Sequence, residues 1–432
     1  MIPIHLVEQD PPLDLPALPA GDFYAFHTMV KPSGAQCNLD CAYCFYLHKE
    51  DLLQQGKTPR MSESLLEAHI RQYLAAQTGP VAVFTWQGGE PTLMGLDFFR
   101  RVVELQARHA RPGQQVENDL QTNGILLNDE WCEFLKQHRF LVGLSIDGPA
   151  ELHDVYRYSK GGKPTFERVM AAVALLHQHQ IRFNALCVVN RLNARKPIDV
   201  YRFLRDQVRP YMIQFLSGVE PVSFHNVAPG YWNPDELPIS GSARAKPGQA
   251  DSVVAEWSVD PEDWGYFLCR VWDEWLKRDF GRVFVDQFEN VISQMLGKGA
   301  QKCVSGQICG KALAIEHNGD VYSCDHFVYP EYKLGNIRDV HEGEMAFSER
   351  QQAFGYAKQN SLPKYCRECS YLNLCWGECP KNRFVKAPDG EAGLNYLCPG
   401  LKKFYAKVTQ DRSVIVQKLT GASKHGAQHR RY

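Results

Sequence analysis

Three cysteines near the N-terminus are spaced to bind one iron–sulfur cluster. Cys37, Cys41 and Cys44 lie within eight residues, so one loop can wrap around a single cubane. A [4Fe–4S] cluster normally takes four cysteine thiolates. A loop that supplies three leaves one iron open, as a catalytic zinc site keeps an open position for chemistry. An open iron can bind a small molecule and pass it an electron. The alternatives are three unrelated cysteines or a partial zinc knuckle.

A second group of eight cysteines lies in the last third of the chain. Its members are Cys303, Cys309, Cys324, Cys366, Cys369, Cys375, Cys379 and Cys398. Eight thiolates are enough for two closed four-ligand clusters, and structural zinc can use four thiolates per site as well. Clustered cysteines in a reducing compartment indicate metal ligands rather than disulfides. We expect the isolated Cys132, Cys187 and Cys269 to be small buried apolar residues.

The elements that must position these cysteines follow a repeating pattern. From residue 22 onward, β-rich runs alternate with amphipathic helical patterns, which is typical of βα units. The expected strands span residues 23–30, 81–86, 116–121, 140–146, 181–189 and 212–216. Six consecutive units predict an α/β fold with a parallel sheet curved into a partial (β/α)6 barrel. Parallel barrels carry their chemistry on the loops after the strands, and the first cysteine loop has such a position.

Several helices have clear signals in the sequence. Ser62 precedes an amphipathic run and is expected to cap it. The helix expected over residues 166–179 has one apolar face, made by Val169, Ala172, Val173 and Leu176. A further helical segment spans residues 264–280, and a strand-like run follows at residues 282–285.

Composition and pattern divide the chain into five segments. They are an N-terminal leader segment (1–21), the partial barrel (22–262), a connecting helical segment (263–302), a small cysteine-rich domain (303–405), and a C-terminal helix with a basic tail (406–432). Within the barrel, residues 217–262 are rich in Pro, Gly and Ser and predict a long loop. Loops of this length are usually functional or disordered. We interpret this one as a wall or lid at the active face, or as a tolerated surface insertion.

The first cysteine loop, followed at once by Phe45 and Tyr46, resembles the signature of the radical S-adenosylmethionine (SAM) enzymes. In that family the amino and carboxylate groups of SAM chelate the open iron. Electron transfer then releases a 5′-deoxyadenosyl radical, a step whose chemistry belongs to the cofactor.

This resemblance also implies cofactor-binding residues. Gly88, Gly89 and Glu90 lie in a Gly-Gly-Glu-Pro loop after the second strand and would bind the amino group of SAM. Glycine lets a ligand approach the main chain closely. Tyr46 would contact the adenine, and Ser145 the polar end or the ribose. The family has an arginine at the SAM carboxylate, for which Arg157 and Arg168 are candidates.

The eight C-terminal cysteines have a spacing similar to that of the SPASM domain, which carries two auxiliary [4Fe–4S] clusters in peptide-modifying radical enzymes. The resemblance implies three clusters in total. The first auxiliary set would be Cys303, Cys309, Cys324 and Cys379. The second auxiliary set would be Cys366, Cys369, Cys375 and Cys398. Cys379 of the first set lies between Cys375 and Cys398 of the second set in the sequence. The two ligand sets therefore cross, which would tie the two halves of the domain together.

Residues 321–328 and 333–337, together with residues 183–189 and the cofactor loops, closely resemble anaerobic sulfatase-maturating enzymes. These enzymes oxidise one Cys or Ser of a sulfatase to Cα-formylglycine after the adenosyl radical abstracts a Cβ hydrogen. The resemblance covers nearly the whole chain and implies that Asp325, beside an auxiliary cysteine, is the general base. Burial can raise the pKa of such a carboxylate.

Two other functions stay open at this point. One is another SPASM peptide maturase, which forms thioether or carbon–carbon crosslinks on a ribosomal precursor peptide. Such enzymes often carry an N-terminal leader-binding domain, and residues 1–21 are too few for a domain. The other is a metal-bearing redox or sensor protein, which the open three-cysteine site disfavours.

Composition limits the partners. The chain has 48 Lys and Arg against 49 Asp and Glu, a net charge of −1. The chain has no basic excess, so its charge gives no indication of nucleic acid or an anionic membrane surface as a partner. We find neither a signal peptide nor an 18-residue apolar run for a membrane span, and we expect a cytoplasmic protein. The resemblance implies an unfolded or nascent sulfatase polypeptide as substrate and a reduced flavodoxin or ferredoxin-like protein as electron donor.

Overall fold

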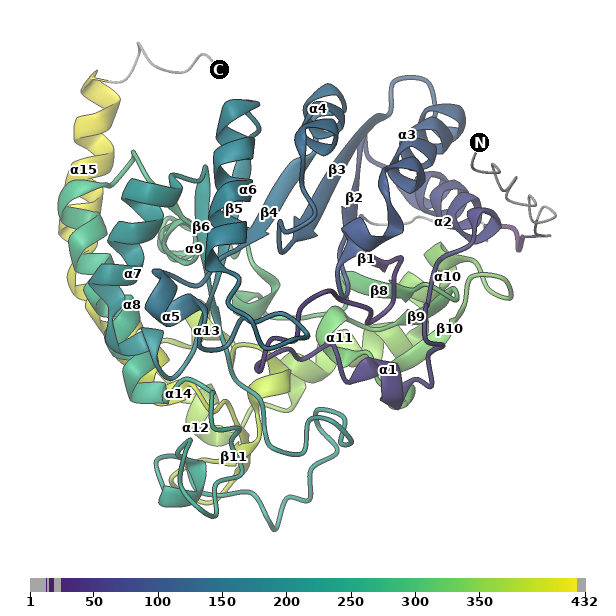
Figure 1. Ribbon diagram of the computed structural model, residues 1–432. Coiled ribbons are helices and arrows are strands. Elements are labelled where there is room, and N and C mark those ends of the chain that lie inside the picture. The colour runs from purple at the N-terminus through teal and green to yellow at the C-terminus, as the bar shows by residue number, and fades with distance from the viewer. Residues whose placement is uncertain (1–12, 14, 19–24, 426–432) are drawn as a thin grey trace.

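Six parallel strands form the centre of the molecule, in the order in which they occur in the sequence (Figure 1). The computed structural model describes residues 13, 15–18 and 25–425. The strands are β1 (His27–Lys31), β2 (Val81–Trp86), β3 (Gln115–Thr122), β4 (Leu141–Ser145), β5 (Phe183–Val189) and β6 (Met212–Ser217). The predicted α/β fold is confirmed, with small differences at the strand ends. Most of the expected leader segment, the start of the first expected strand, and residues 426–432 of the basic tail lie outside the described residues.

Helices connect these strands and continue to the C-terminus. They are α1 (Lys49–Leu52), α2 (Glu63–Ala76), α3 (Leu96–His109), α4 (Asp129–Gln137), α5 (Ala150–His153), α6 (Phe166–Gln178), α7 (Pro197–Phe203), α8 (Pro261–Arg278), α9 (Asp286–Met295), α10 (Glu342–Phe347), α11 (Glu349–Asn360), α12 (Lys364–Arg367), α13 (Leu372–Cys375), α14 (Cys398–Gln410) and α15 (Arg412–His425). The Ser62 hydroxyl accepts from the Leu65 amide at 3.3 Å and caps α2 as predicted. The predicted apolar face of α6 is buried.

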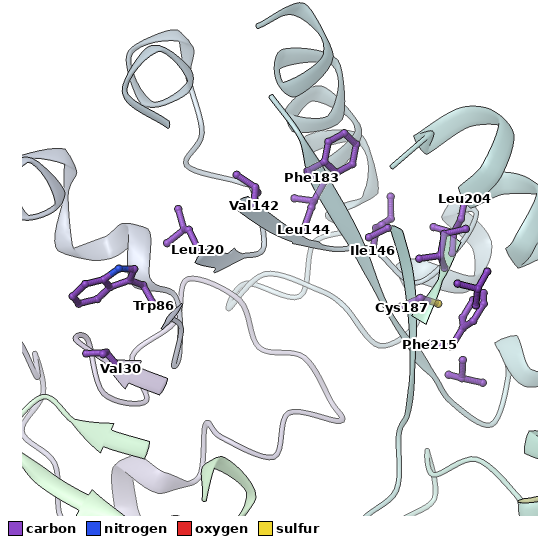
Figure 2. Packing of buried hydrophobic residues seen from close by; sticks show 14 of the residues in the cluster. Val30, Trp86, Leu120, Val142, Leu144, Ile146, Phe183, Cys187, Leu204 and Phe215 are labelled. Carbon is purple, nitrogen blue, oxygen red and sulfur yellow. The ribbon is translucent and has the colours of Figure 1, made fainter. Parts of the chain in front are cut away.

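The hydrophobic core follows the sheet. Val30, Trp86, Leu120, Leu144 and Phe215 come from five of the six parallel strands, and each is at most 1% exposed (Figure 2). This row packs the sheet against its helices, for example through Trp86 against Phe99 of α3 and Phe215 against Phe267 of α8. Two of the isolated cysteines, at positions 132 and 187, are fully buried as predicted, whereas the one at position 269 is half-buried.

The sheet is longer than the sequence predicted. It has ten strands in the order β10-β9-β8-β1-β2-β3-β4-β5-β6-β7. The strand-like run expected at residues 282–285 is confirmed as β7 (Phe284–Val285). The strands that the sequence did not predict are β8 (Ala312–Glu316), β9 (Asp320–Tyr322) and β10 (Lys333–Asn336), while β11 (Val385–Lys386) and β12 (Ala392–Leu394) form a separate pair. β8 lies parallel to β1, with partners from His27 and Ala312 to Lys31 and Glu316. Strands β8 to β10 belong to the expected cysteine-rich segment, yet they lie in the same sheet as the barrel strands. The sheet therefore continues across the expected boundary at residue 303.

This pairing has a simple physical reason. Without it β1 would be an edge strand with unpaired backbone groups. The apolar residues 313–315 of β8 are completely buried against it. β9 runs antiparallel to β8, and Asp325, which follows it closely, forms an ion pair with Lys31 at the end of β1, where the cysteine loop begins.

The long loop at residues 217–262 is largely irregular, as predicted, but it is fastened at several points. The Tyr329 hydroxyl donates to the Phe224 carbonyl at 2.6 Å. The Lys381 ammonium donates to the Glu220 carboxylate at 2.5 Å. Because these bonds join the loop to the cysteine-rich segment, they favour the wall interpretation over a loose insertion. None of the helices in the described part of the chain combines the length and apolar character needed to cross a membrane.

A buried polar cluster joins α10 of the cysteine-rich segment to the barrel. The Thr28 hydroxyl donates to Glu342 Oε1 at 2.5 Å, and His69 Nδ1 lies 2.8 Å from Glu342 Oε2. The Glu342 amide donates to Gln72 Oε1 at 2.8 Å. The side chains of His69 and Glu342 are 0% exposed. A buried charge is tolerated only when it is paired and hydrogen-bonded, so this cluster fixes the two parts of the fold together.

We predict that His69→Leu destabilises the protein by about 3–5 kcal/mol, because it leaves the Glu342 carboxylate buried without its partner. Replacing both residues by Leu should recover part of this loss. Thermal unfolding of the reconstituted protein, followed by circular dichroism, measures the order of these variants. The exposed pair of Arg100 and Glu130 provides the control, because Arg100→Leu should cost less than about 1 kcal/mol. Equal effects of His69→Leu and Arg100→Leu would contradict this account.

Candidate active site

A cavity of about 340 Å³ lies where the carboxyl ends of the parallel strands face the cysteine-rich segment. Nine residues predicted from the sequence line it: Cys37, Cys41, Cys44, Tyr46, Gly88, Gly89, Glu90, Ser145 and Cys379. The loops after β1, β2, β3 and β4 therefore meet at one place, as expected for a parallel barrel. Residues 217–220 and Trp257 of the long loop form part of the wall.

The cysteine loop is held in place by a buried clamp from the loops after β4 and β5. The Tyr43 hydroxyl, in the middle of the cysteine motif, donates to the Asp147 carboxylate. Arg157 Nη1 donates to the Tyr43 hydroxyl at 2.8 Å, and the Val188 amide donates to Asp147 Oδ1 at 2.9 Å. Asp147 is 0% exposed and Arg157 is 6% exposed. Burial raises the pKa of Asp147, and the Arg157 guanidinium opposes that rise.

The glycine pair has a packing role that the sequence did not predict. A Cβ on Gly89 would lie 2.0 Å from the Gln36 carbonyl oxygen, and one on Gly88 would lie 2.9 Å from the Gly34 carbonyl oxygen. The Gly89 amide donates to the Gly34 carbonyl at 2.9 Å. The absence of side chains thus lets this loop pack directly on the cysteine loop, in addition to any approach of a ligand.

The Glu90 carboxylate is occupied by hydrogen bonds within the protein. It accepts from the Thr92 amide at 3.1 Å, the Thr92 hydroxyl at 2.6 Å, the Thr122 hydroxyl at 2.7 Å and the Asn123 amide at 2.8 Å. Asn123 in turn donates from Nδ2 to Asn38 Oδ1 at 2.7 Å, inside the cysteine loop. The carboxylate therefore positions the Thr-Asn-Gly loop. The main chain of Glu90 is bound to the cysteine loop, because its amide donates to the Gln36 carbonyl at 2.8 Å.

The first three cysteines suit an iron–sulfur cluster. Burial raises the pKa of Cys37 and of Cys41 to about 12. Metal binding requires deprotonated thiols, so a cation at this site is what makes the thiolates stable. In the described residues no three Cys, His, Asp or Glu side chains are close enough to hold a single metal ion. A zinc site needs ligands about 2.0–2.3 Å from one ion, whereas each cysteine of a cluster binds a different iron.

Four C-terminal thiols interact with one another as one group. Burial raises the pKa of Cys324, and the thiols of Cys379 and Cys303 raise it further. Burial also raises the pKa of Cys309 and of Cys379. Cys303 adds to the rise at Cys309, and Cys309 adds to the rise at Cys379. These are the members of the first auxiliary set.

The other four thiols form a separate group. Burial raises the pKa of Cys375, with further contributions from Cys398 and Cys366, and Cys369 acts in the same way on Cys366. All four line a second cavity of about 20 Å³. The two groups coincide with the two predicted auxiliary sets and keep them apart. The assignment of each cysteine as a ligand stays a prediction.

Asp325 does not line the main cavity, although the Lys31 ammonium with which it forms an ion pair does. This pair lacks the angles of a hydrogen bond, but the charges are in contact. Burial by itself would raise the pKa of Asp325, as the sequence suggested. Burial is the largest single influence, but Lys31, His326 and Lys49 together outweigh it, so the pKa of Asp325 is lowered instead. Lys31 also lies 4.5 Å from the centre of the Tyr46 ring.

The structure separates the two arginine candidates. Arg157 lines the cavity, and its Nε is buried without a hydrogen-bond partner among the described residues. Arg168 is exposed on α6. Sequence reasoning missed Lys31, His326 and Lys381, all of which line the cavity. Lys31 directly precedes the cysteine loop, a position that could have indicated it. The other two are brought in only by the fold.

Comparisons with known proteins agree with this geometry. The Radical SAM superfamily model matches residues 32–204, and the SPASM model of an iron–sulfur cluster-binding domain matches residues 303–370. The serine-type anaerobic sulfatase-maturating enzyme of Bacteroides thetaiotaomicron is 46% identical over 382 residues, which is 88% of this chain and 89% of the relative. The cysteine-type enzyme of Clostridium perfringens is 31% identical over 380 residues, 87% of this chain and 94% of the relative.

Solved structures extend the comparison. "Native anSMEcpe with bound AdoMet and Cp18Cys peptide" has a TM-score of 0.77 and 29% identity, and the match covers 91% of this chain and 99% of that one. The peptide-bound SuiB of Streptococcus suis has a TM-score of 0.56 at 15% identity, covering 87% of this chain and 76% of that one, and shows the fold alone. The chain therefore belongs to the anaerobic sulfatase-maturating enzymes, radical SAM enzymes that carry [4Fe–4S] clusters, use S-adenosylmethionine and act on a peptide.

Proposed function

We propose that the protein oxidises a serine of a sulfatase polypeptide to Cα-formylglycine and that it also accepts cysteine. The observation that supports serine is the difference in identity, 46% to a serine-type enzyme against 31% to a cysteine-type enzyme. The cavity between the strand ends and the cysteine-rich segment is where the target side chain binds. When bound, the cofactor supplies the 5′-deoxyadenosyl radical that removes a Cβ hydrogen.

The first cysteine loop holds the cluster that binds SAM. Around it, the main chain of residues 88–90 binds the SAM amino group, Tyr46 the adenine, Ser145 the polar end or the ribose, and Arg157 the carboxylate. The unpartnered Nε of Arg157 supports its assignment. The auxiliary sets hold the two remaining clusters, and the separate grouping of their thiols supports this.

Asp325 is the base that takes the proton of the target hydroxyl. The chemistry needs one, because the carbon radical becomes an aldehyde only when it loses this proton and one electron, which an auxiliary cluster would accept. Pairing with Lys31 keeps the carboxylate ionised and therefore able to accept a proton. Lys31 lines the cavity, so a shift of its ammonium toward a bound substrate exposes the carboxylate to the target.

The partners follow from the same chemistry. The substrate is an unfolded or nascent sulfatase polypeptide, because a target side chain inside a folded sulfatase would not reach a cavity behind a wall. A reduced flavodoxin or ferredoxin-like protein supplies the electron. The cytoplasm is the expected location, since its reducing conditions keep the eleven predicted cysteine ligands from forming disulfides.

Incubation of the anaerobically reconstituted protein with reductant, SAM and two peptides tests this function. The peptides carry Ser-x-Ala-x-Arg and Cys-x-Pro-x-Arg, and mass spectrometry follows them. We expect an aldehyde on the serine peptide and also on the cysteine peptide. Cofactor cleavage with both peptides unchanged would refute the substrate assignment, and an aldehyde on the cysteine peptide alone would refute the serine assignment.

Replacing the proposed base tests its role separately. We predict that Asp325→Asn lowers aldehyde formation by about 10²–10⁴-fold, the usual contribution of a general base. Reductive SAM cleavage should stay within about threefold of the unchanged protein, because that step needs no base. Both products are measured in the same reaction. Asp339→Asn is the matched control, because Asp339 is exposed in the same segment. Unchanged aldehyde output from Asp325→Asn would remove this residue from the mechanism.

A further inference from the structure

A buried arginine lies between the two auxiliary sets. Arg383 is 6% exposed, and its guanidinium donates to four acceptors. These are the carbonyls of Lys358 at 2.7 Å, Trp376 at 3.0 Å and Gly377 at 3.2 Å, and the Ser361 hydroxyl at 3.2 Å. All four acceptors are neutral. Among the described residues no carboxylate forms an ion pair with this side chain, although a buried charge normally requires a counter-charge.

The segment that this arginine holds connects the two sets. Only three residues separate Cys375 of the second set from Cys379 of the first, and all three have a left-handed backbone. The φ angles are 48° for Trp376, 68° for Gly377 and 51° for Glu378. A non-glycine residue in this region costs about 1–2 kcal/mol. The hydrogen bonds from the guanidinium to two of the three carbonyls stabilise this strained connection.

The hydrogen bonds of Arg383 place its charge beside both sets. Its guanidinium donates to the carbonyls of Trp376 and Gly377, which lie between Cys375 of the second set and Cys379 of the first. Gly377 is two residues from each of these cysteines. The buried cation is thus fixed to the main chain next to a cysteine of each set.

A second buried cation serves the first set alone. Lys358 is 1% exposed. Its ammonium donates to the carbonyls of Cys303 and Val304 at 2.7 Å each. The ammonium is thus fixed to the main chain of a cysteine of the first set. In the described part of the chain no carboxylate pairs with Lys358 either.

We propose that Arg383 and Lys358 are buried counter-charges that raise the reduction potentials of the auxiliary clusters. Arg383 acts on both clusters and Lys358 on the first alone. A cluster with four thiolate ligands is anionic, and reduction adds one further negative charge. A nearby buried cation stabilises the reduced form more than the oxidised form, since Coulomb interactions are strong where water is excluded. Both residues are positioning residues, and the inference rests on the two proposed ligand sets.

Redox titration of the anaerobic holoenzyme, followed by electron paramagnetic resonance, tests this inference. The variants are Arg383→Gln, which removes the charge but keeps amide donors, Arg383→Lys, which keeps the charge, and Lys358→Gln. The control Arg350→Gln removes an exposed arginine from the same segment. Iron content is measured for each variant, so that a shifted potential is not confused with a lost cluster.

We expect Arg383→Gln to shift both auxiliary couples toward the oxidised form by at least about tenfold, which is about 59 mV for one electron. Lys358→Gln should shift one couple only, and Arg383→Lys and Arg350→Gln should leave both within about threefold. Full iron content with unchanged potentials in Arg383→Gln, or a shift of one couple only, would overturn the inference for Arg383. A shift of both couples or of neither in Lys358→Gln would overturn it for Lys358.

Loss of iron is informative as well. If Arg383→Gln loses iron, Arg383→Lys decides between charge and hydrogen bonding. Full iron content and normal potentials in the lysine variant support the counter-charge, whereas loss of iron there too means that the clusters need the guanidinium hydrogen bonds instead. Absence of two auxiliary signals in the unchanged holoenzyme would refute the ligand sets themselves, which is a separate result.

Discussion

The pairing of β8 with β1 is the constraint on which the rest of the structure depends. These strands are almost three hundred residues apart in the chain, yet they form a parallel ladder of five residue pairs. The strand that leads into the first cysteine loop is thereby paired with the strand that leads toward Cys324 and Asp325. One side of the active site comes from the barrel and the other from the cysteine-rich segment. The buried cluster around Glu342 and the fastened loop at residues 217–262 hold the same two parts together.

Local sequence was a good guide wherever the determining interactions are local. The six parallel strands were predictable because each is a short β-rich run followed by turn residues, and β2 has the predicted bounds. The cysteine spacing indicated metal binding for the same reason. The ladder between β8 and β1 was not predictable, because a strand of five residues carries no signal of its partner. The role of Gly89 was only partly predictable, since the need for glycine arises from the Gln36 carbonyl of another loop.

Buried charge is the feature that sequence analysis described least well. Lys31, Lys358 and Arg383 have few or no local signals, because each acquires its environment from segments that meet only in the folded chain. The pKa shift at Asp325 has the opposite direction from the one expected, since Lys31, His326 and Lys49 together outweigh the effect of burial. A chain that binds several anionic clusters needs cations in its interior.

The account rests on two independent groups of cysteines, one that binds the cofactor cluster and one that binds the auxiliary clusters. The most direct measurement replaces Cys37, Cys41 and Cys44 by Ala together and determines iron content, auxiliary-cluster signals and SAM cleavage under anaerobic conditions. We predict loss of about a third of the iron, because one of three clusters of equal size is removed. Both auxiliary signals should persist and SAM cleavage should be abolished. Retention of all the iron, or loss of the auxiliary signals together with the first cluster, would contradict the account.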